Sequence, residues 1–250
     1  MAVQVTVVGC AGSYPGRDSP ASCYLIDADG YRIVLDLGNG AVGTLQRFAG
    51  LYEIDAVCLS HQHSDHCLDM TGYCVARVHH PEGPRPRIPV YGPAGIEDRL
   101  VRAHGLDPGH GMPEAFDFVT LEPGTIEIGP VKVTTGHMNH PVETFGFRLE
   151  HGGRTVAYSA DTGLADQLVQ LAAGADVLLC EASFLAGPDL PANLHLTAGQ
   201  AGEHAARAGV GELVLTHLVA WNDKAASMEQ AAATFGGKLT MAATGLQLLP

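Results

Sequence analysis

Apolar and polar residues alternate over residues 3–9 (VQVTVVG), a period of two that predicts a β-strand with one buried face. The pattern returns in residues 23–38 (CYLIDADGYRIVLDLG), where Asp29 and Gly30 are the expected turn of a β-hairpin. An apolar run at residues 54–60 (IDAVCLS) predicts a further strand. The first part of the chain therefore begins as a sheet.

Helical and extended segments alternate through the rest of the chain. The predicted segments are a helix after His66 over 67–80, a proline-rich extended segment over 81–93, a helix over 95–105 ended by Gly105, a loop over 107–116, strands within 117–136 and 144–161, a helix over 164–174, a strand over 175–183, a helix over 196–209, a strand over 212–218 and a last helix near 227–237. No linker-like break interrupts this alternation, which predicts a single α/β domain over residues 1–250.

Three apolar runs end at a residue with ligand or acid–base chemistry. AVCLSH ends at His61, VLLCEAS reaches Glu181 near its end, and LVLTH ends at His217. Strands whose carboxyl ends point at one site are typical of α/β enzymes.

Composition limits the classes of partner. Apolar residues make up 46% of the 250 residues, enough for a substantial core. The formal net charge is −13, with 27 acidic and 14 basic residues and no run of Lys or Arg. This balance argues against binding of long nucleic acid, which needs clusters of basic residues, but does not exclude a small phosphate ester held at a metal.

The N-terminal segment contains no basic n-region or cleavage site, and no apolar stretch is long enough to cross a membrane. The six cysteines form no CxxC pair, and several lie inside apolar runs, so we expect buried, reduced thiols. Both features favour a cytoplasmic protein without a membrane partner. Cys67 follows a histidine cluster directly, and its role stays open.

That cluster is HQHSDH, residues 61–66. On a tight turn His61 and His63 can bind one ion, and Asp65 and His66 can reach a second. Imidazoles together with a carboxylate suit Zn²⁺, with Mn²⁺ or Fe as alternatives.

A site for two metals needs ligands from elsewhere in the chain. His140, Asp161 and His217 are the candidates because each lies at the end of an extended segment. From the residues alone, His137 competes with His140 for the same role.

Eight motifs together resemble one family, the metallo-β-lactamase-fold hydrolases, and within it the ribonuclease Z branch. They are GCAGSYPG (9–16), IVLDLGNG (33–40), SHQHSDH (60–66), HPVETFGFRL (140–149), YSADTG (158–163), DVLLCEASF (176–184), HLTAGQAGEHA (195–205) and LVLTHL (213–218). The match covers nearly the whole chain and favours His140 over His137. It implies an αββα sandwich, with two central mixed β-sheets flanked by helices.

The resemblance also implies a set of ligands for two divalent metal ions. One metal would be held by His61, His63, His140 and Asp161, and the other by Asp65, His66, His217 and the shared Asp161.

Roles for the remaining motif residues follow from the same resemblance. A hydroxide held between the two cations would attack the ester, oriented by Asp65. Asp36 would hydrogen-bond a ligand imidazole. His195, paired with Glu181, would protonate or stabilise the leaving oxygen.

The chain departs from the tRNA-processing members in three places. Only 20 residues separate His140 from Asp161, which leaves no room for their long RNA-binding arm. The loop PGRDSPAS (15–22) lacks their basic pattern, and DLGNGAVG (36–43) replaces their Glu-Gly-Thr-Gln motif.

The overall pattern is similar instead to an actinobacterial subgroup associated with cyclic-nucleotide hydrolysis. We therefore expect a phosphodiesterase for a small ester, with a 3′,5′-cyclic nucleotide ahead of a 2′,3′-cyclic one. Ser13, Arg17 and Ser22 are candidate contacts for its phosphate or ribose.

Three alternatives stay open. The chain could be a ribonuclease Z-type endonuclease that processes tRNA 3′ ends, a metallo-hydrolase of another ester (or a lactamase or thioesterase), or a metal-binding protein without catalysis. Proteins of this fold are frequently dimers, so a homodimer is also considered.

Overall fold

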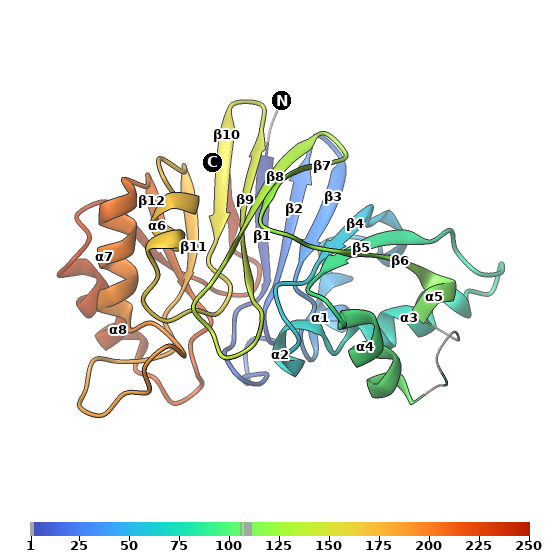
Figure 1. Cartoon of the computed structure of the whole chain (residues 1–250), viewed down its shortest axis with the longest axis horizontal. Coiled ribbons are helices and arrows are strands. Elements are labelled where there is room, and N and C mark those ends of the chain that lie inside the picture. Colours follow the sequence, from blue (N-terminus) through green and yellow to red (C-terminus); the bar gives the residue numbers. More distant parts are fainter. Residues whose placement is uncertain (1–2, 106, 108–111) are drawn as a thin grey trace.

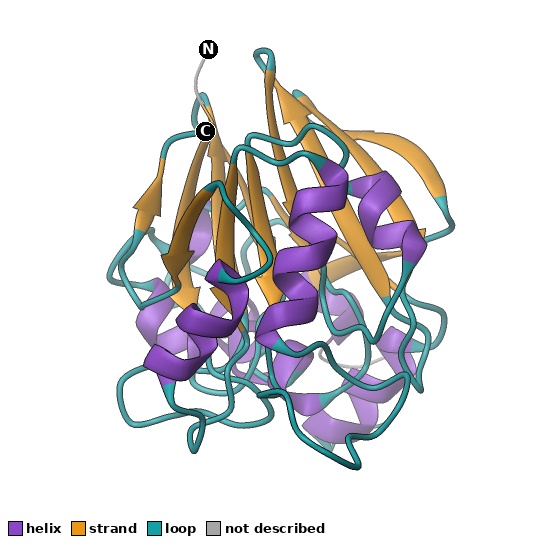
Figure 2. Cartoon of the chain, turned by 90° about the vertical axis from the view of Figure 1, so that its left-hand side faces the viewer, coloured by secondary structure: helices purple, strands orange, loops and turns teal. Residues whose placement is uncertain are grey.

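Two seven-stranded β-sheets pack face to face in the computed structural model of the chain, which describes residues 3–105, 107 and 112–250. Helices cover the outer face of each sheet, so the layers run helix, sheet, sheet, helix (Figure 1). Figure 2 shows one helical layer in front of the strands it covers. The predicted fold class, two mixed sheets flanked by helices, is confirmed.

The first sheet contains the N-terminal strands. Its order is β14 (Gln247–Leu248), β1 (Val3–Gly9), β2 (Cys23–Ala28), β3 (Tyr31–Leu35), β4 (Ala56–Cys58), β5 (Ile88–Gly92) and β6 (Phe116–Thr120). Pairing is antiparallel from β14 to β3 and parallel from β3 to β6. The predicted hairpin turn is confirmed, because Asp29 and Gly30 have φ values of 52° and 92°, as a type I′ turn requires.

The second sheet contains the C-terminal strands. Its order is β13 (Lys238–Met241), β12 (Glu212–Thr216), β11 (Val177–Glu181), β10 (Arg154–Tyr158), β9 (Phe145–His151), β8 (Val131–His137) and β7 (Gly124–Ile128). Pairing is parallel from β10 to β13 and antiparallel from β7 to β10. Both sheets are thus mixed, and each has a parallel half.

The helices form the two outer layers. The first sheet is covered by α1 (Ala41–Leu45), η1 (Leu51–Glu53), α2 (Ser64–Cys67), α3 (Met70–Val78), α4 (Ile96–His104) and α5 (Met112–Ala115), and the second by α6 (Asp166–Leu171), α7 (Ala198–Ala208) and α8 (Lys224–Ala232). Gly105 ends α4 in the left-handed conformation, as predicted. None of these helices is long and apolar enough to span a membrane, among the residues described.

Hydrophobic packing fixes how the two sheets meet. One buried cluster lies between them and joins residues of the first sheet, such as Tyr24 and Ile26, to residues of the second, such as Phe147 and Tyr158. The Tyr24 and Tyr158 rings lie 4.9 Å apart between centroids. Because aromatic side chains bury large apolar areas, this contact holds the two sheets in a fixed relation.

The predicted helix over 67–80 is wrong at its start. Helix α2 already begins at Ser64, and the chain leaves the helix before α3 begins at Met70. The amide of Asp69 donates to Leu37 O rather than to the preceding turn, and its carboxylate accepts from the amide of Val42. The long-range contacts of Asp69 therefore divide a segment that the local sequence pattern predicts as one continuous helix.

Short elements were missed for a different reason. The sequence predicted neither α1 nor the edge strands β13 and β14, because each is too short for a clear period. Of the loop predicted over 107–116, Met112–Ala115 is helix α5, and residues 108–111 lie outside the described part of the chain. The single-domain assignment stays a prediction.

Candidate metal centre

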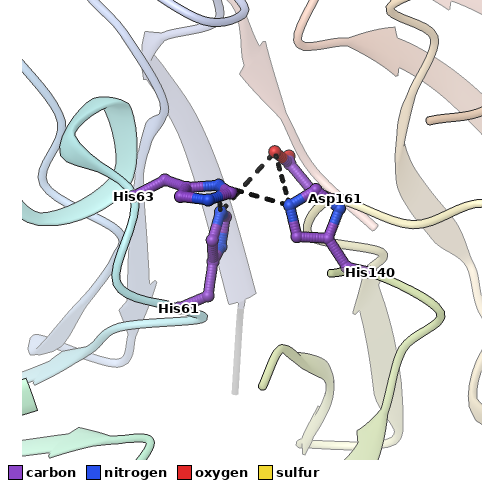
Figure 3. Close-up of side chains that lie close together, drawn as sticks. All are labelled: His61, His63, His140 and Asp161. Atoms are coloured by element: carbon purple, nitrogen blue, oxygen red, sulfur yellow. Dashed lines mark hydrogen bonds and ion pairs between the residues drawn. The ribbon is translucent and has the colours of Figure 1, made fainter. Parts of the chain in front are cut away.

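Polar side chains gather where strands of both sheets end. His61 follows β4, Asp161 follows β10 and His217 comes directly after β12. Parallel strands bring their carboxyl ends to one edge of a sheet, so residues far apart in sequence can meet there. Figure 3 shows His61, His63, His140 and Asp161 pointing toward one another.

All seven side chains predicted as ligands lie together in two groups. The groups are His61, His63, His140 and Asp161, and Asp65, His66, Asp161 and His217, and within each group the ligand atoms lie within 4.8 Å of one another. Asp161 Oδ2 is 3.6 Å from His61 Nε2, whereas Asp161 Oδ1 is 3.2 Å from His66 Nε2 and 3.4 Å from His217 Nε2. Each oxygen of Asp161 thus faces a different group, as in a carboxylate that bridges two cations.

Hydrogen bonds fix the tautomers of four imidazoles. The donors and acceptors are His66 Nδ1 to Asp36 Oδ2 (2.7 Å), His140 Nδ1 to Leu194 O (2.9 Å), His61 Nδ1 to Ser60 Oγ (2.9 Å) and His217 Nδ1 to Ser183 Oγ (2.8 Å). The two serine hydroxyls must accept here, because they already donate to Asp36 and to His217 O. All four Nε2 atoms therefore carry a lone pair toward the centre.

This arrangement fits cations and little else. Asp161 is 2% exposed, and its Oδ1 is buried without a hydrogen-bond partner. Burial acts to raise the pKa of Asp161, but the positive charge that His217 and His66 carry when they are protonated outweighs it and holds that pKa well below its usual value. Burial and the neighbouring His66 lower the pKa of His61, which favours its neutral form. A buried carboxylate surrounded by lone pairs is costly unless cations lie between them.

The backbone around the centre is strained. Asp36, Ala160 and His217 have φ values of 57°, 51° and 55°, in the left-handed region that favours glycine. Each such residue costs about 1–3 kcal/mol. Since the three positions carry or adjoin site residues, the strain lies where the backbone orients side chains toward the metal centre.

Two glycines let the loops of the centre approach closely. A Cβ at Gly38 would lie 1.9 Å from Asp65 O, and a Cβ at Gly12 would lie 2.4 Å from His217 O. Both contacts are with backbone, so a side chain at either glycine would displace a ligand loop. The two motifs GCAGSYPG and IVLDLGNG thus have a steric role.

The predicted pair of Glu181 and His195 lies beside the shared carboxylate. His195 Nδ1 donates to Glu181 Oε1 at 2.9 Å and is 4.0 Å from Asp161 Oδ2. Glu181 is fully buried and also accepts from the amide of Thr162 at 2.7 Å. Burial acts to lower the pKa of His195, but Glu181 raises it to about 9. The pair can thus supply a proton beside the centre.

A cleft of about 560 Å³ opens onto the centre. It is lined by Ser13, Gln62, His63, Ser64, Asp65, Arg99, His140, Val142, Asp161, Leu194 and His195. Of the three predicted substrate contacts, Ser13 lies in this lining. Arg17 lines two other hollows, and Ser22 is fully buried, so neither is part of the cleft lining, and their contact with a substrate stays a prediction. The loop that carries them folds back against the first sheet, where Ala21 N donates to Asn39 O.

Two polar residues of the cleft, Arg99 and Gln62, were not predicted from the sequence. Arg99 lies on α4 and forms no ion pair with any described residue, whereas Arg102 on the same helix pairs with Asp98 at 3.7 Å. Gln62 donates to Ala94 O at 2.7 Å, which ties the histidine loop to the start of α4. The available signal was an arginine on a predicted helix in a strongly acidic chain, but no local pattern relates α4 to the cleft.

Two residues that the sequence left open have other places. His137 is exposed at the end of β8 and belongs to neither ligand group. Cys67 is buried, and burial raises the pKa of its thiol to about 12. Its Sγ donates to His63 O at 3.2 Å. In this structure Cys67 therefore supports the histidine loop.

Comparison with known proteins gives one family. A model described as the Beta-lactamase superfamily domain matches residues 31–218. An uncharacterised protein of Mycobacterium leprae is 42% identical over 97% of this chain and 87% of its own length. A protein named ribonuclease Z from Mycolicibacterium gilvum is 32% identical over 87% of this chain and 84% of its own length.

A solved structure shows the same similarity in three dimensions. The metallo-beta-lactamase fold protein YhfI from Bacillus subtilis superposes with a TM-score of 0.90 and 29% sequence identity, and all of both chains is covered. The two chains therefore share their architecture from end to end.

Replacing Asp161 by Asn tests the bridging role. We expect Asp161→Asn to lose most bound metal, because one oxygen ligand becomes an amide nitrogen, with a loss of affinity above the about 10–100-fold that follows removal of an outer-shell partner. Metal per chain, measured by plasma mass spectrometry after dialysis, checks this. Asp166→Asn, at an exposed aspartate paired with Arg207, should keep its metal. Full metal in Asp161→Asn together with an unchanged melting temperature would contradict the assignment.

Proposed function

The chain belongs to the beta-lactamase superfamily of metal-dependent hydrolases, and on that premise we propose that it hydrolyses a small phosphodiester, with a cyclic nucleotide as first candidate. One observation carries the proposal: Asp161 faces two ligand groups at once, and the His195–Glu181 pair lies beside it. When bound, two divalent cations would activate water and neutralise charge that develops at phosphorus. Zn²⁺ suits this mixture of imidazole and carboxylate ligands best.

The side chains divide the work of the reaction. Asp65 has an oxygen 3.1 Å from His217 Nε2 and lines the cleft, so it can orient the attacking water while it binds metal. His195 also lines the cleft, and Glu181 holds its ring in place. His195 protonates the oxygen that leaves phosphorus, a transfer that matters most when the leaving group is a poor one.

The cleft supports a small substrate over RNA. Arg99 is the one arginine among the described residues that line the cleft, and no lysine is among them, which suits an ester with a single negative charge. RNA binding through many phosphates needs several basic residues. The interval between His140 and Asp161 is filled by β9 and β10, which the tight Gly152–Gly153 turn joins. This compact hairpin takes the place where an RNA-binding arm would begin.

A tRNA 3′-end endonuclease is the second candidate. It is favoured by one observation, the 32% identity to a protein named ribonuclease Z. A tRNA carries many phosphate charges and a cyclic nucleotide carries one. Salt should therefore weaken binding of the tRNA far more than binding of the cyclic nucleotide.

Side-by-side hydrolysis assays test the proposal. The metal-loaded protein is offered 3′,5′-cyclic AMP, 2′,3′-cyclic AMP, bis-p-nitrophenyl phosphate and a precursor tRNA, each at low and high salt. We expect turnover of a cyclic nucleotide that changes little with salt, and no cleavage of the tRNA. Salt-sensitive 3′-end cleavage of the tRNA alone would contradict the small-ester proposal.

Leaving-group dependence tests the role of His195. We expect His195→Ala to slow hydrolysis of 3′,5′-cyclic AMP by about 10²–10⁴-fold, because an alkoxide leaves poorly without a proton. The same variant should slow bis-p-nitrophenyl phosphate far less, since p-nitrophenolate leaves unprotonated. Glu181→Gln should show the same ordering more weakly, and His104→Ala, on α4, should match the unaltered protein. Equal losses on both esters would argue against proton donation.

Arg99 and Arg102 form a matched pair on α4. We expect Arg99→Gln to raise KM for the phosphodiester about 10-fold or more with a smaller change in kcat, because a charged hydrogen bond contributes about 1.5–3 kcal/mol. Steady-state kinetics check this, with Arg102→Gln as a control that should change neither constant. Unchanged KM in Arg99→Gln would remove Arg99 from substrate binding.

A further inference from the structure

The metal centre leaves two exposed aromatic side chains unexplained. Trp221, the single tryptophan of the chain, is 72% exposed, and Tyr14 is 44% exposed. Their ring centroids lie 6.0 Å apart at an interplanar angle of 40°. Large aromatic rings left in water commonly mark a surface that binds something planar or apolar.

Both rings are connected to the cleft through the backbone. Tyr14 adjoins Ser13, which lines the cleft, and Trp221 follows the ligand His217 by four residues. The two loops are joined, because the amide of Gly12 donates to Leu218 O at 3.0 Å. The aromatic pair therefore lies on the N-terminal and C-terminal loops that border the metal centre.

Hydrogen bonds order the loop that carries Trp221, although the ring itself is exposed. Asn222 donates from its amide to Val219 O at 3.0 Å and from its side chain to Ser183 O at 2.8 Å. Ser183 in turn accepts from His217 Nδ1. On the other loop, Ser13 has a φ of 64°, which fixes how Tyr14 leaves the cleft wall. Both rings are thus presented on ordered backbone.

We propose that Tyr14 and Trp221 form an aromatic platform that stacks the base of a nucleotide whose phosphodiester lies in the metal cleft. The inference rests on the proposed function and assigns the binding site for the base of its nucleotide substrate. A base offers a flat face to any aromatic ring, and such stacking tolerates different bases. Two rings bury a few hundred Å², well below the roughly 1,200 Å² of a stable protein interface, so a base suits the platform better than a second copy of the chain.

Two esters with one leaving group isolate the contribution of the base. Thymidine 5′-p-nitrophenyl phosphate and methyl p-nitrophenyl phosphate both release p-nitrophenol, but only the first carries a nucleoside. We expect the metal-loaded protein to prefer the thymidine ester in kcat/KM. Trp221→Ala should lower that preference by roughly 5- to 100-fold through KM, the range given by stacking on one base. Its rate on the methyl ester should stay unchanged.

Matched variants separate stacking from structural damage. Trp221→Phe should keep most of the preference because a ring remains, and Tyr14→Ala should lower it. Leu249→Ala, at an apolar residue that is 76% exposed, should change nothing. Equal loss on both esters in Trp221→Ala would assign the residue to holding the His217 loop and overturn the platform. Conversion of a dimer to a monomer by Trp221→Ala, seen by sedimentation, would overturn it in favour of a subunit interface.

A binding measurement keeps the inference testable without turnover. Because Trp221 is the single tryptophan, its fluorescence reports on the platform directly. Adenosine 5′-monophosphate should quench it saturably in the metal-loaded protein, whereas methyl phosphate should not. Quenching without hydrolysis of any ester would support the platform and contradict the phosphodiesterase, and hydrolysis without quenching would do the reverse.

Discussion

The buried carboxylate of Asp36 is the contact on which the rest of the site depends. It lies directly after β3 and accepts from the amide and the hydroxyl of Ser60, from His66 Nδ1 and from the phenol of Tyr158. Tyr158 ends β10, so the same carboxylate links the two sheets. Through Ser60 it also determines the proton position of His61. The desolvation cost of burying the Asp36 carboxylate is offset here because hydrogen-bond donors from both sheets replace the lost water.

The groups around this carboxylate position one another in sequence, from the sheets to the cation site. The sheets position the strand ends, hydrogen-bonded groups at those ends orient the imidazoles, and the imidazoles with Asp161 shape a space for cations. Strain at three backbone positions is tolerated because the packed sheets overdetermine the local geometry. The centre is therefore precise although its side chains come from loops, and the cleft above it is free to vary in charge and shape.

The sequence alone indicated those candidate site residues that a short, local stretch of sequence identifies. HQHSDH concentrates four candidate ligands within six residues, and the end of an apolar run made His217 a further candidate. The assignment of these residues to two metals came from the family resemblance. Asp36 and the role of His195 came only through family resemblance, since a single carboxylate or imidazole has no pattern of its own. Arg99 was not predicted because the position of α4 beside the cleft is set by tertiary structure, which the local sequence does not reveal. Arg17 and Ser22 lie outside the cleft lining because the loop that carries them folds back against the first sheet. The short edge strands were not predicted because they are too short to show a period of two.

The close approach at Gly12 and Gly38 has a consequence for how this family varies. Neither glycine offers a functional group, yet each occupies a point where two loops leave no volume for even a methyl group. Selection should therefore tolerate change there as poorly as at the ligands themselves. A survey of mutational tolerance would group these two positions with the catalytic residues, although their whole contribution is the absence of a side chain.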